Sequence, residues 1–407
     1  MSLPRLEAVP SNSEIHLDMN EPSQHLDTHI FHGIESLSIT HFDNSKNLST
    51  RFLHFSTSFP SLQSLCVRAS YPSHDGNLSS DPFRSLPRTL KRLTLCDVPL
   101  YPSFCQLQTL TNLHLDCGAF DHTLDTLLEV LDRNPSLKDV DLRIQFKSRE
   151  LRRSNRRVPV QMTNNLKYLG IASNEAEDIK ALISQVTLSR GVVLAVKHSR
   201  EAEGFRTILS DINTTRFKNL ASPIHMEYAH GLFSMFSGEE GGLVLKVDDD
   251  LPCNGALSFG KIRECPVMGS LCRTIQLLDL TMHRQPGVFE PSLFPALEIL
   301  IINRDSNLKE TLAELFSLPH LCPELKALEF LKCDISGEFT TELTQYVSAR
   351  KRITSGQLLR ITIVHKEVAF DGGDLIKERL EGHVQKLWVG QNPPPYLRDY
   401  LERHTRD

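Results

Sequence analysis

Leu62-Gln-Ser-Leu65-Cys-Val67 and Leu90-Lys-Arg-Leu93-Thr-Leu95 are two copies of the short pattern that decides the fold of this chain. In each copy, an apolar residue is followed three positions later by a second, and two positions after that by a third. The second and third residues point the same way in a strand, because successive side chains alternate between its faces. The pattern therefore predicts a short strand with one buried side. Two more clear copies are Leu110-Thr-Asn-Leu113-His-Leu115 and Leu137-Lys-Asp-Val140-Asp-Leu142.

The pattern repeats along most of the chain, mostly at intervals of about 20 to 29 residues, the length of a leucine-rich repeat. Proline stands just before several copies, as in Asn134-Pro135-Ser-Leu137 and Phe294-Pro295-Ala-Leu297, where it favours an extended entry into the strand. Leu124, Leu127, Leu128 and Leu131 have helical spacing before one such proline. Each unit therefore predicts a strand, a loop, a helix and a loop. Further copies begin at Ile34, Leu166, Ile275, Leu325, Leu358 and Val384.

These repeats predict an α/β leucine-rich-repeat solenoid, a horseshoe or arc with a parallel sheet on its concave face and irregular helices on its convex face. We expect residues 1–30 to form an N-terminal tail or capping strand, residues 31–390 the solenoid, and residues 391–407 a C-terminal capping segment. The repeats are weakest over residues 175–270. Here we expect the solenoid to continue through strand pairs, with a globular insertion as the alternative; the pairs are Leu194/Val196, Ile224/Met226 and Leu245/Val247.

One repeat carries a family resemblance. Cys322-Pro precedes Leu325 and Leu328, and Phe330-Leu-Lys-Cys333-Asp-Ile335 follows. This repeat resembles the cysteine-containing repeats of F-box leucine-rich-repeat proteins, and the architecture over residues 30–390 resembles the large fungal families of F-box-like proteins. Asn174 and Cys333 are the best matches to the Asn or Cys that these repeats carry after the strand. The resemblance implies substrate recognition in a ubiquitin-ligase system, although residues 1–30 contain no helical F-box segment.

Composition excludes several other classes of protein. Hydrophobic residues make up 40% of the 407 residues and charged residues 23%, as in ordinary folded proteins. The net charge of -5 gives no overall attraction to nucleic acid or to an acidic membrane. The N-terminus has no secretory pattern, and no apolar run approaches the ~20 residues of a membrane helix. With nine scattered cysteines, these features predict a cytoplasmic or nuclear protein with reduced thiols.

No catalytic or cofactor motif is found in the sequence. It has no phosphate-binding loop, no dinucleotide fingerprint and no Gly-x-Ser-x-Gly motif. The His25, His29 and His32 group lacks the spacing of known zinc sites, as does the group of Cys253, Cys265 and Cys272. We therefore expect no enzyme activity, no cofactor and no metal. An enzyme with a scattered active site is a remote alternative, because such sites are recognised by geometry.

The strand pattern also predicts which side chains face a partner. Residues that alternate with the buried pair must point to the opposite, concave face, where solenoids usually bind. In the N-terminal half this face is polar and carries both charges, and its candidate partner-binding residues are His114, Asp116, Asp141 and Arg143. In the C-terminal half it is expected to expose apolar groups, which favour a protein-binding patch. The candidates there are Ile299, Ile301, Glu329, Leu331 and Trp388.

Two alternatives stay open. The segment from Pro393 to Leu401 could fold back as a cap whose Tyr and Leu side chains cover Trp388. A basic loop could instead bind nucleic acid or serve a nuclear role, although a solvated loop in place of a repeat helix is the simpler interpretation. Its basic residues are Arg149, Arg152, Arg153, Arg156 and Arg157. The leading prediction is a non-catalytic scaffold that binds a protein partner, for which a ubiquitin-ligase adaptor is one candidate. Binding to nucleic acid or to a membrane is not expected.

Overall fold

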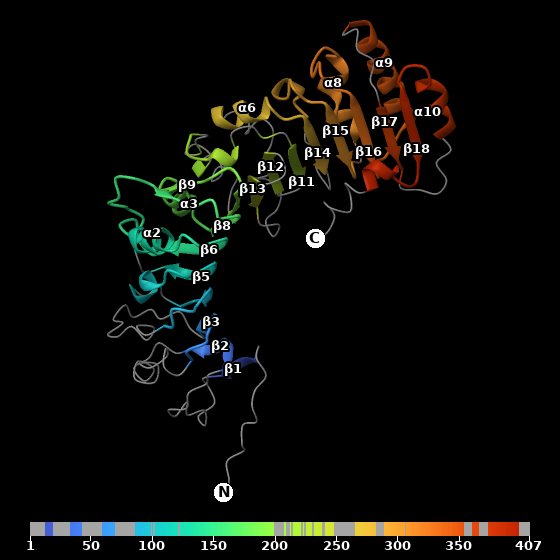
Figure 1. Ribbon diagram of the computed structural model, residues 1–407. Helices are drawn as coiled ribbons and strands as arrows, with labels where there is room; N and C mark the ends of the chain where they lie inside the picture. Colours follow the sequence, from blue (N-terminus) through green and yellow to red (C-terminus); the bar gives the residue numbers. More distant parts are fainter. Residues whose placement is uncertain are drawn as a thin grey trace. The chain divides into compact units, whose positions relative to one another are not determined.

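The computed structural model describes residues 13–18, 33–42, 59–69, 86–98, 100, 102–120, 123–198, 207–208, 212, 215–220, 223, 225–229, 232–237, 241–247, 265–281, 289–305, 307–353, 360–365 and 373–398. These residues form a mixed α/β structure with long runs of parallel strands and few helices (Figure 1). The chain divides into an N-terminal unit, residues 1–200 with 211–219, and a C-terminal unit, residues 201–210 with 220–407.

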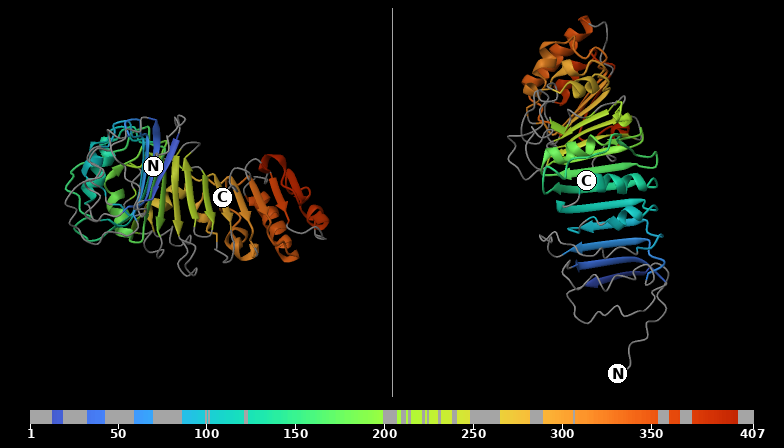
Figure 2. Two further views of the ribbon diagram at one scale, coloured as in Figure 1. Left: turned by 90° about the horizontal axis from the view of Figure 1, so that it is seen from below. Right: turned by 90° about the vertical axis from the view of Figure 1, so that its left-hand side faces the viewer.

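The N-terminal unit contains a parallel series of strands in chain order, visible as successive rungs from blue to green in Figure 2. A small second sheet pairs β7 (Val160–Gln161) with β9 (Val186–Thr187). The helical elements are η1 (Pro102–Gln106), α2 (Leu124–Arg133) and α3 (Ala176–Ile183). The main strands are β1 (Ser13–Asp18), β2 (Ile34–Phe42), β3 (Ser64–Ala69), β4 (Arg92–Cys96), β5 (Asn112–Phe120), β6 (Asp139–Phe146), β8 (Tyr168–Ser173) and β10 (Val193–His198).

Alternation along these strands separates a buried face from an open face. In β5, Leu113 and Leu115 are 1% and 0% exposed, whereas His114 between them is partly exposed on the other side. The predicted helix is confirmed as α2, whose N-cap is Thr123 and whose apolar side is buried. We use "open face" for the side of each sheet that carries residues such as His114, opposite the buried leucines.

The two best matches to the Asn or Cys that follows a repeat strand differ in burial. The Asn174 side chain is exposed. The buried polar groups at this position are Ser173 and Asp178, and the Ser173 hydroxyl donates to the Asp178 carboxylate at 3.0 Å. Cys333, the other expected residue, is buried, and its thiol donates to the Ile302 carbonyl at 3.3 Å.

The C-terminal unit has two kinds of strand pairing. β11 (His225–Ala229), β12 (Leu232–Ser237) and β13 (Gly241–Val247) pair antiparallel. From β11 onward the series is parallel, through β14 (Leu277–Thr281), β15 (Ile299–Asn303), β16 (Ala327–Leu331), β17 (Arg360–Val364) and β18 (Lys386–Gly390). The helical elements are α6 (Pro266–Cys272), η3 (Pro291–Leu293), α7 (Leu308–Thr311), α8 (Ala313–Ser317), α9 (Gly337–Ile353) and α10 (Gly373–Leu380), while η2 (Lys218–Leu220) spans the sequence boundary between the units.

The antiparallel strands correct the expectation of an unbroken parallel solenoid across residues 175–270. Strands do occur at the expected positions near Leu194, Met226 and Leu245, as β10, β11 and β13. An additional strand, β12, lies between β11 and β13 and runs antiparallel to both, so the chain reverses direction before it and again after it. Only residues 230–231 separate β11 from β12, too few for the crossover of about a dozen residues that parallel pairing requires.

The core of the C-terminal unit lies between its sheet and its helices. Phe330 of β16 packs edge-on against Phe339 of α9, with ring centroids 5.3 Å apart, and Phe316 packs against both Phe339 and Tyr346. The residues predicted to be buried by the repeat pattern, such as Leu328 and Phe330, are each 0% exposed. Because these side chains meet the helices, Ala327, Glu329 and Leu331 lie on the open face of the same strand.

Candidate functional site

The candidate site lies on the open face of the N-terminal sheet, where parallel register aligns side chains from neighbouring strands in rows. Across β4, β5, β6 and β8 the middle row is Thr94, His114, Asp141 and Gly170. Two positions earlier in each strand, a second row contains Arg92, Asn112, Asp139 and Tyr168. Two positions later, a third row contains Cys96, Asp116, Arg143 and Ala172. The three rows place polar and charged groups of distant repeats side by side.

The first two rows surround a hollow of about 560 Å³ in the N-terminal unit. It holds a histidine, two carboxylates, an arginine and a tyrosine, so its lining mixes hydrogen-bond donors, acceptors and an aromatic ring. It is lined by Ser64, Arg92, Leu93, Thr94, Asn112, Leu113, His114, Asp139, Asp141 and Tyr168. The volume lies in the range of ligand-binding pockets, but the lining is mainly polar, whereas small-molecule pockets are mainly apolar.

A His–Asp pair lies at the centre of the hollow. His114 Nδ1 and Asp141 Oδ2 are 3.0 Å apart, and their side chains are 40% and 46% exposed. Glycine at position 170 makes room for this pair, because a Cβ there would lie 2.6 Å from Asp141 Oδ1 and 2.9 Å from the Tyr168 ring. Among the described residues, Asp141 is the only side chain that hydrogen-bonds His114. Within the described part of the chain, no hydroxyl or thiol hydrogen-bonds His114 as the nucleophile of a Ser–His–Asp site does.

Two neighbouring groups hold their protons more tightly than usual. Partial burial raises the pKa of Asp139, and the nearby Asp141 carboxylate raises it further, while His114 opposes the shift. Burial likewise raises the pKa of Tyr168, and Asp141 and Asp139 add to that shift. Both pKa shifts come mainly from burial, and the neighbouring carboxylates add a smaller contribution. A positively charged or hydrogen-bond-donating group of a ligand would lower the pKa of both residues.

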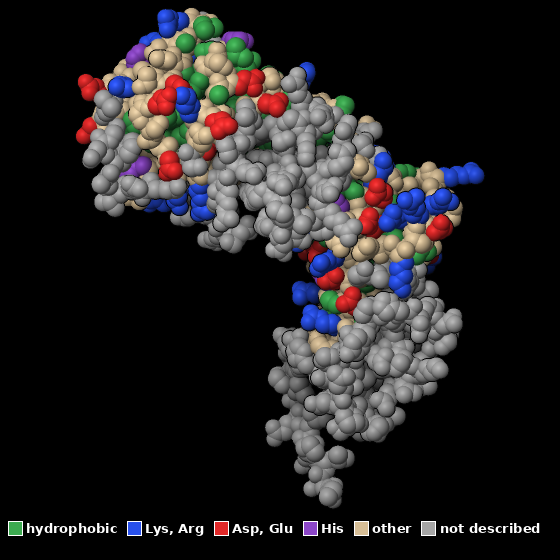
Figure 3. All heavy atoms as spheres, turned by 180° about the vertical axis from the view of Figure 1, so that it is seen from behind, with side chains coloured by type: hydrophobic (Ala, Val, Ile, Leu, Met, Phe, Trp, Pro, Cys, Tyr) green, Lys and Arg blue, Asp and Glu red, His purple; other side chains and the backbone are tan. Residues whose placement is uncertain are grey.

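The third row remains accessible to a partner. Arg143 Nε and Asp116 Oδ1 are 3.8 Å apart, and their side chains are 64% and 38% exposed. An exposed pair at this distance contributes less than about 1 kcal/mol, so both groups can exchange partners at little cost. The predicted residues His114, Asp116, Asp141 and Arg143 are therefore brought together on one face. Positive and negative side chains are interspersed on the face of the molecule shown in Figure 3.

The predicted apolar patch of the C-terminal half is not open. Ile301 and Leu331 are each 2% exposed and Glu329 is 1% exposed, so the expectation that they face solvent is wrong. Ile301 and Leu331 are covered by Leu397, which packs against them and Val364, with Ile299 partly buried at the edge. The C-terminal segment thus folds back as expected, but over a different part of the face. Trp388 stays 43% exposed and donates its Nε1 hydrogen to the Asn392 carbonyl at 3.1 Å.

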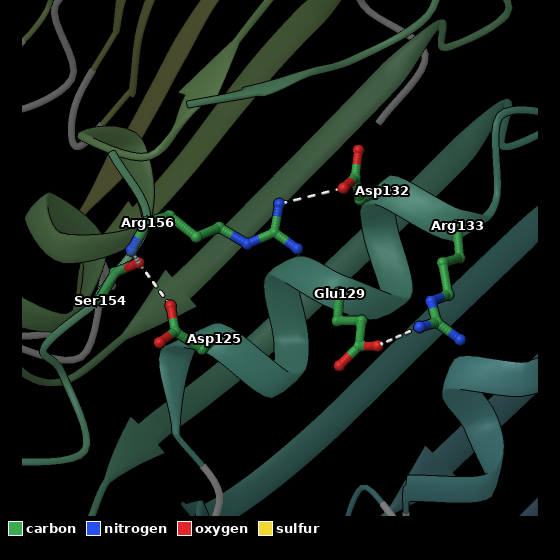
Figure 4. A network of polar contacts seen from close by, with 6 residues as sticks. All are labelled: Asp125, Glu129, Asp132, Arg133, Ser154 and Arg156. Atoms are coloured by element: carbon green, nitrogen blue, oxygen red, sulfur yellow. Dashed lines mark hydrogen bonds and ion pairs between the residues drawn. The ribbon is translucent and has the colours of Figure 1, made fainter. Parts of the chain in front are cut away.

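The basic loop is a non-helical segment whose charges are partly paired (Figure 4). Arg156 contacts Asp132 of α2 at 3.0 Å, and the Ser154 hydroxyl donates to Asp125 of the same helix. Arg152 forms an ion pair with Asp178, which is fully buried at the start of α3. These two arginines therefore hold the loop against the helices. The remaining basic residues, Arg149, Arg153 and Arg157, are exposed.

Sequence reasoning missed part of the hollow. Arg92, Asn112, Asp139 and Tyr168 were not among the predicted site residues, yet they line it. Each comes one position before the second apolar residue of its repeat, so extending the alternation backward by one step would have found them. Gly170 could not be found in this way, because its role depends on the side chains of other strands.

The described residues contain no cluster of three or more His, Cys, Asp or Glu side chains that could hold a metal ion. None of the helices described is long and apolar enough to cross a membrane. No family model and no curated protein matches the chain. Among solved structures, it is similar to a crystal structure of a Bacteroides fragilis protein, at 14% identity and a TM-score of 0.28, with 76% of this chain and 72% of that chain covered. A similarity this weak assigns neither fold nor function.

Proposed function

We propose that this chain is a leucine-rich-repeat scaffold that binds a protein partner on the open face of its N-terminal unit. The assignment to leucine-rich repeats is supported by backbone hydrogen bonds that recur from one repeat to the next. The first leucine of a repeat donates its N–H to the carbonyl three residues earlier, as in Leu62 to Phe59 and Leu137 to Asn134, both at 3.2 Å. The next residue donates to the equivalent residue of the preceding repeat, as in Lys91 to Gln63 at 2.8 Å.

Side-chain hydrogen bonds reinforce these links between repeats. Thr109 donates its hydroxyl to the Leu90 carbonyl at 2.8 Å. Asn134, 1% exposed, donates to the Val130 carbonyl at 2.8 Å and accepts from the Leu110 N–H at 3.2 Å. The Cys117 thiol donates to the Val98 carbonyl at 3.2 Å. Repeats cannot bury their apolar sides alone, and such links satisfy the backbone groups that stacking removes from water.

The observation that carries the binding proposal is the hollow around His114 and Asp141. Its half-exposed charges, together with Arg143 and Asp116 beside it, offer directional contacts on a rigid sheet. Charged groups at an interface provide specificity and faster association more than they provide affinity. A folded protein with complementary charges suits this surface, and the resemblance to F-box leucine-rich-repeat proteins suggests a ubiquitin-ligase substrate or adaptor as that partner.

The test uses two matched charge reversals on the full chain. Arg143→Glu changes the open face, and Arg157→Glu makes the same change in the basic loop; both arginines are exposed. Wild type and both variants are used for affinity capture from native cells, and the affinity of each captured protein is then measured. We expect Arg143→Glu to weaken the specific partner about tenfold, or ~1.4 kcal/mol, and Arg157→Glu to leave it unchanged.

The opposite pattern would contradict the proposal. If Arg157→Glu alone removes the captured material, and binding falls steeply with added salt, the basic loop binds an anionic partner such as nucleic acid. If both variants capture the same proteins with the same affinity as wild type, the open face of the N-terminal unit is not the binding surface. Circular dichroism of both variants checks that neither substitution has unfolded the protein.

A further inference from the structure

The C-terminal segment, residues 393–398, lies across the open face of the C-terminal sheet. It ends in one helical turn, in which the N–H groups of Leu397 and Arg398 donate to the Pro394 carbonyl at 3.0 and 3.1 Å. In Figure 1 this turn is the short red helix near the ends of β16 and β17. These backbone hydrogen bonds join residues within the segment and do not pair it with a strand, so the segment is not a further strand of the sheet. We call this segment the strap.

The strap contributes one side chain to an apolar cluster on the sheet. Leu397 is 3% exposed and packs against Ile301, Leu331 and Val364, which come from three neighbouring strands. Parallel register places Leu331 directly beside Val364, and Ile301 one row away on β15. The three side chains that Leu397 contacts therefore all come from the sheet itself.

A second side chain of the strap is recognised by polar groups. The Arg360 guanidinium lies over the Tyr396 ring, 4.3 Å from its centroid. The Tyr396 hydroxyl and the Thr362 hydroxyl are 2.7 Å apart. Arg360 also contacts the Glu329 carboxylate at 2.5 Å. The Tyr396 ring thus contacts Arg360, its hydroxyl contacts Thr362, and the Leu397 side chain contacts the apolar cluster. Together these contacts favour a tyrosine followed by a leucine.

The closed arrangement leaves buried polar atoms without partners. Among the described residues, neither Glu329 Oε2 nor Arg360 Nε has a hydrogen-bond partner, although both atoms are buried. Burial also raises the pKa of Glu329, which Arg360 only partly offsets. Unpaired buried polar groups oppose the closed state, and water would reach them when the strap leaves. The strap is therefore held by a few contacts and opposed by incomplete polar pairing.

We propose that Ile301, Leu331, Val364, Arg360 and Thr362 form a binding site for a short peptide carrying a tyrosine followed by a leucine, which the strap occupies in cis. A partner protein with such a segment would bind when the strap is displaced. Tethering gives the strap an effective concentration in the millimolar range, so weak contacts suffice to keep the site closed. This site is separate from the hollow around His114, and its test is independent of the N-terminal binding proposal.

The experiment measures binding of a fluorescent peptide, Asn-Pro-Pro-Pro-Tyr-Leu-Arg, which copies residues 392–398. The full chain is used as wild type, as Tyr396→Ala/Leu397→Ala, and as Arg398→Ala, a control on the exposed side of the strap. We expect the double variant to bind the peptide at least tenfold more tightly than wild type or the Arg398→Ala variant. A peptide with alanine in place of Tyr and Leu should bind none of them.

Two results would overturn the proposal: no peptide binding by a folded double variant, or equal binding by all three proteins. Circular dichroism establishes whether the double variant is folded. If it is not, hydrogen exchange of the wild type decides. Exchange of the Leu397 and Arg398 amides at least tenfold faster than those of β16 and β17 supports a displaceable strap, whereas exchange together with these strands refutes it.

Discussion

Replacing Arg350 should destabilise the C-terminal unit more than any exposed substitution on the same helix. Arg350 lies in α9 and is 2% exposed. Its Nη1 donates to the carbonyls of Pro319 and Leu321 at 3.2 and 3.3 Å. Its Nη2 is 2.9 to 3.1 Å from the carbonyls of Cys322, Pro323 and Leu325. One guanidinium therefore holds the whole turn that leads into β16.

The size of the effect follows from these contacts. A hydrogen bond to a charged group contributes about 1.5 to 3 kcal/mol, and a buried carbonyl left without a donor costs about 1 to 3 kcal/mol. The five contacts of Arg350 are not additive, because water and backbone movement replace some of them. We expect Arg350→Ala to lower the free energy of unfolding by about 3 to 5 kcal/mol. Arg350→Lys should lower it by about 1 to 3 kcal/mol, since an ammonium group is compact and has only three donors.

The assay is urea unfolding followed by the fluorescence of Trp388, which is the single tryptophan of the chain and lies in β18 of the same unit. With a slope of about 2 kcal/mol per molar urea, Arg350→Ala should lower the unfolding midpoint by more than about 1 M. Arg352→Ala is the control, because this exposed arginine bonds only the Ser348 carbonyl among the described contacts. Equal midpoints for the Arg350→Ala and Arg352→Ala variants would refute the reasoning.

Three further predictions concern buried groups. Arg152→Ala should lower the free energy of unfolding by about 3 kcal/mol, measured by thermal unfolding, because it leaves the fully buried Asp178 without its cationic partner. Replacement of the exposed Arg153 by alanine should lower it by less than about 0.5 kcal/mol. Burial raises the pKa of Glu329 above its usual 4.5, so its contribution to stability is greatest below that pH and declines as the pH rises through the higher folded value. Wild type should therefore lose melting temperature relative to Glu329→Gln as the pH rises above 4.5, and a melting-temperature difference that does not change with pH would contradict this. Burial raises the thiol pKa to about 12 at Cys117, Cys272 and Cys322. At pH 8, iodoacetamide should therefore modify these thiols at least about a thousandfold more slowly in native than in unfolded protein. Comparable rates in the two states would contradict their burial.

The sequence predicted the buried side of the sheets well, because that information is local. Leu113 and Leu115 lie two positions apart in one strand, and the same spacing in each repeat identifies the side chains that share a face. Register follows from repetition, so His114 and Asp141 could be placed side by side without a structure. The antiparallel strand β12 does not follow from apolar spacing, because its direction is set by the short connection to β11.

Long-range contacts account for the other errors. Nothing near Ile301 in the sequence indicates that Leu397 covers it, since the two are far apart in the chain and meet only through folding. Arg350 belongs to the run Ala-Arg-Lys-Arg, which is typical of an exposed helix end, and its burial depends on carbonyls that another segment supplies. In the same way, Arg152 was counted with a basic loop, although Asp178 of α3 pairs with it.

The open faces of the two units both consist of residues aligned in rows by parallel strands, but one carries charged side chains and the other apolar ones. This difference determines which face can stay in contact with water when no partner is bound. His114, Asp141 and Arg143 remain hydrated when no partner is present, so the N-terminal face can stay uncovered. Ile301 and Leu331 in equivalent positions of the C-terminal sheet would form an exposed apolar patch, which favours aggregation unless something covers it. A covering segment carried by the same chain solves this problem at any protein concentration. If the two proposals hold, a partner of the C-terminal face competes with the strap, whereas a partner of the N-terminal face displaces only water.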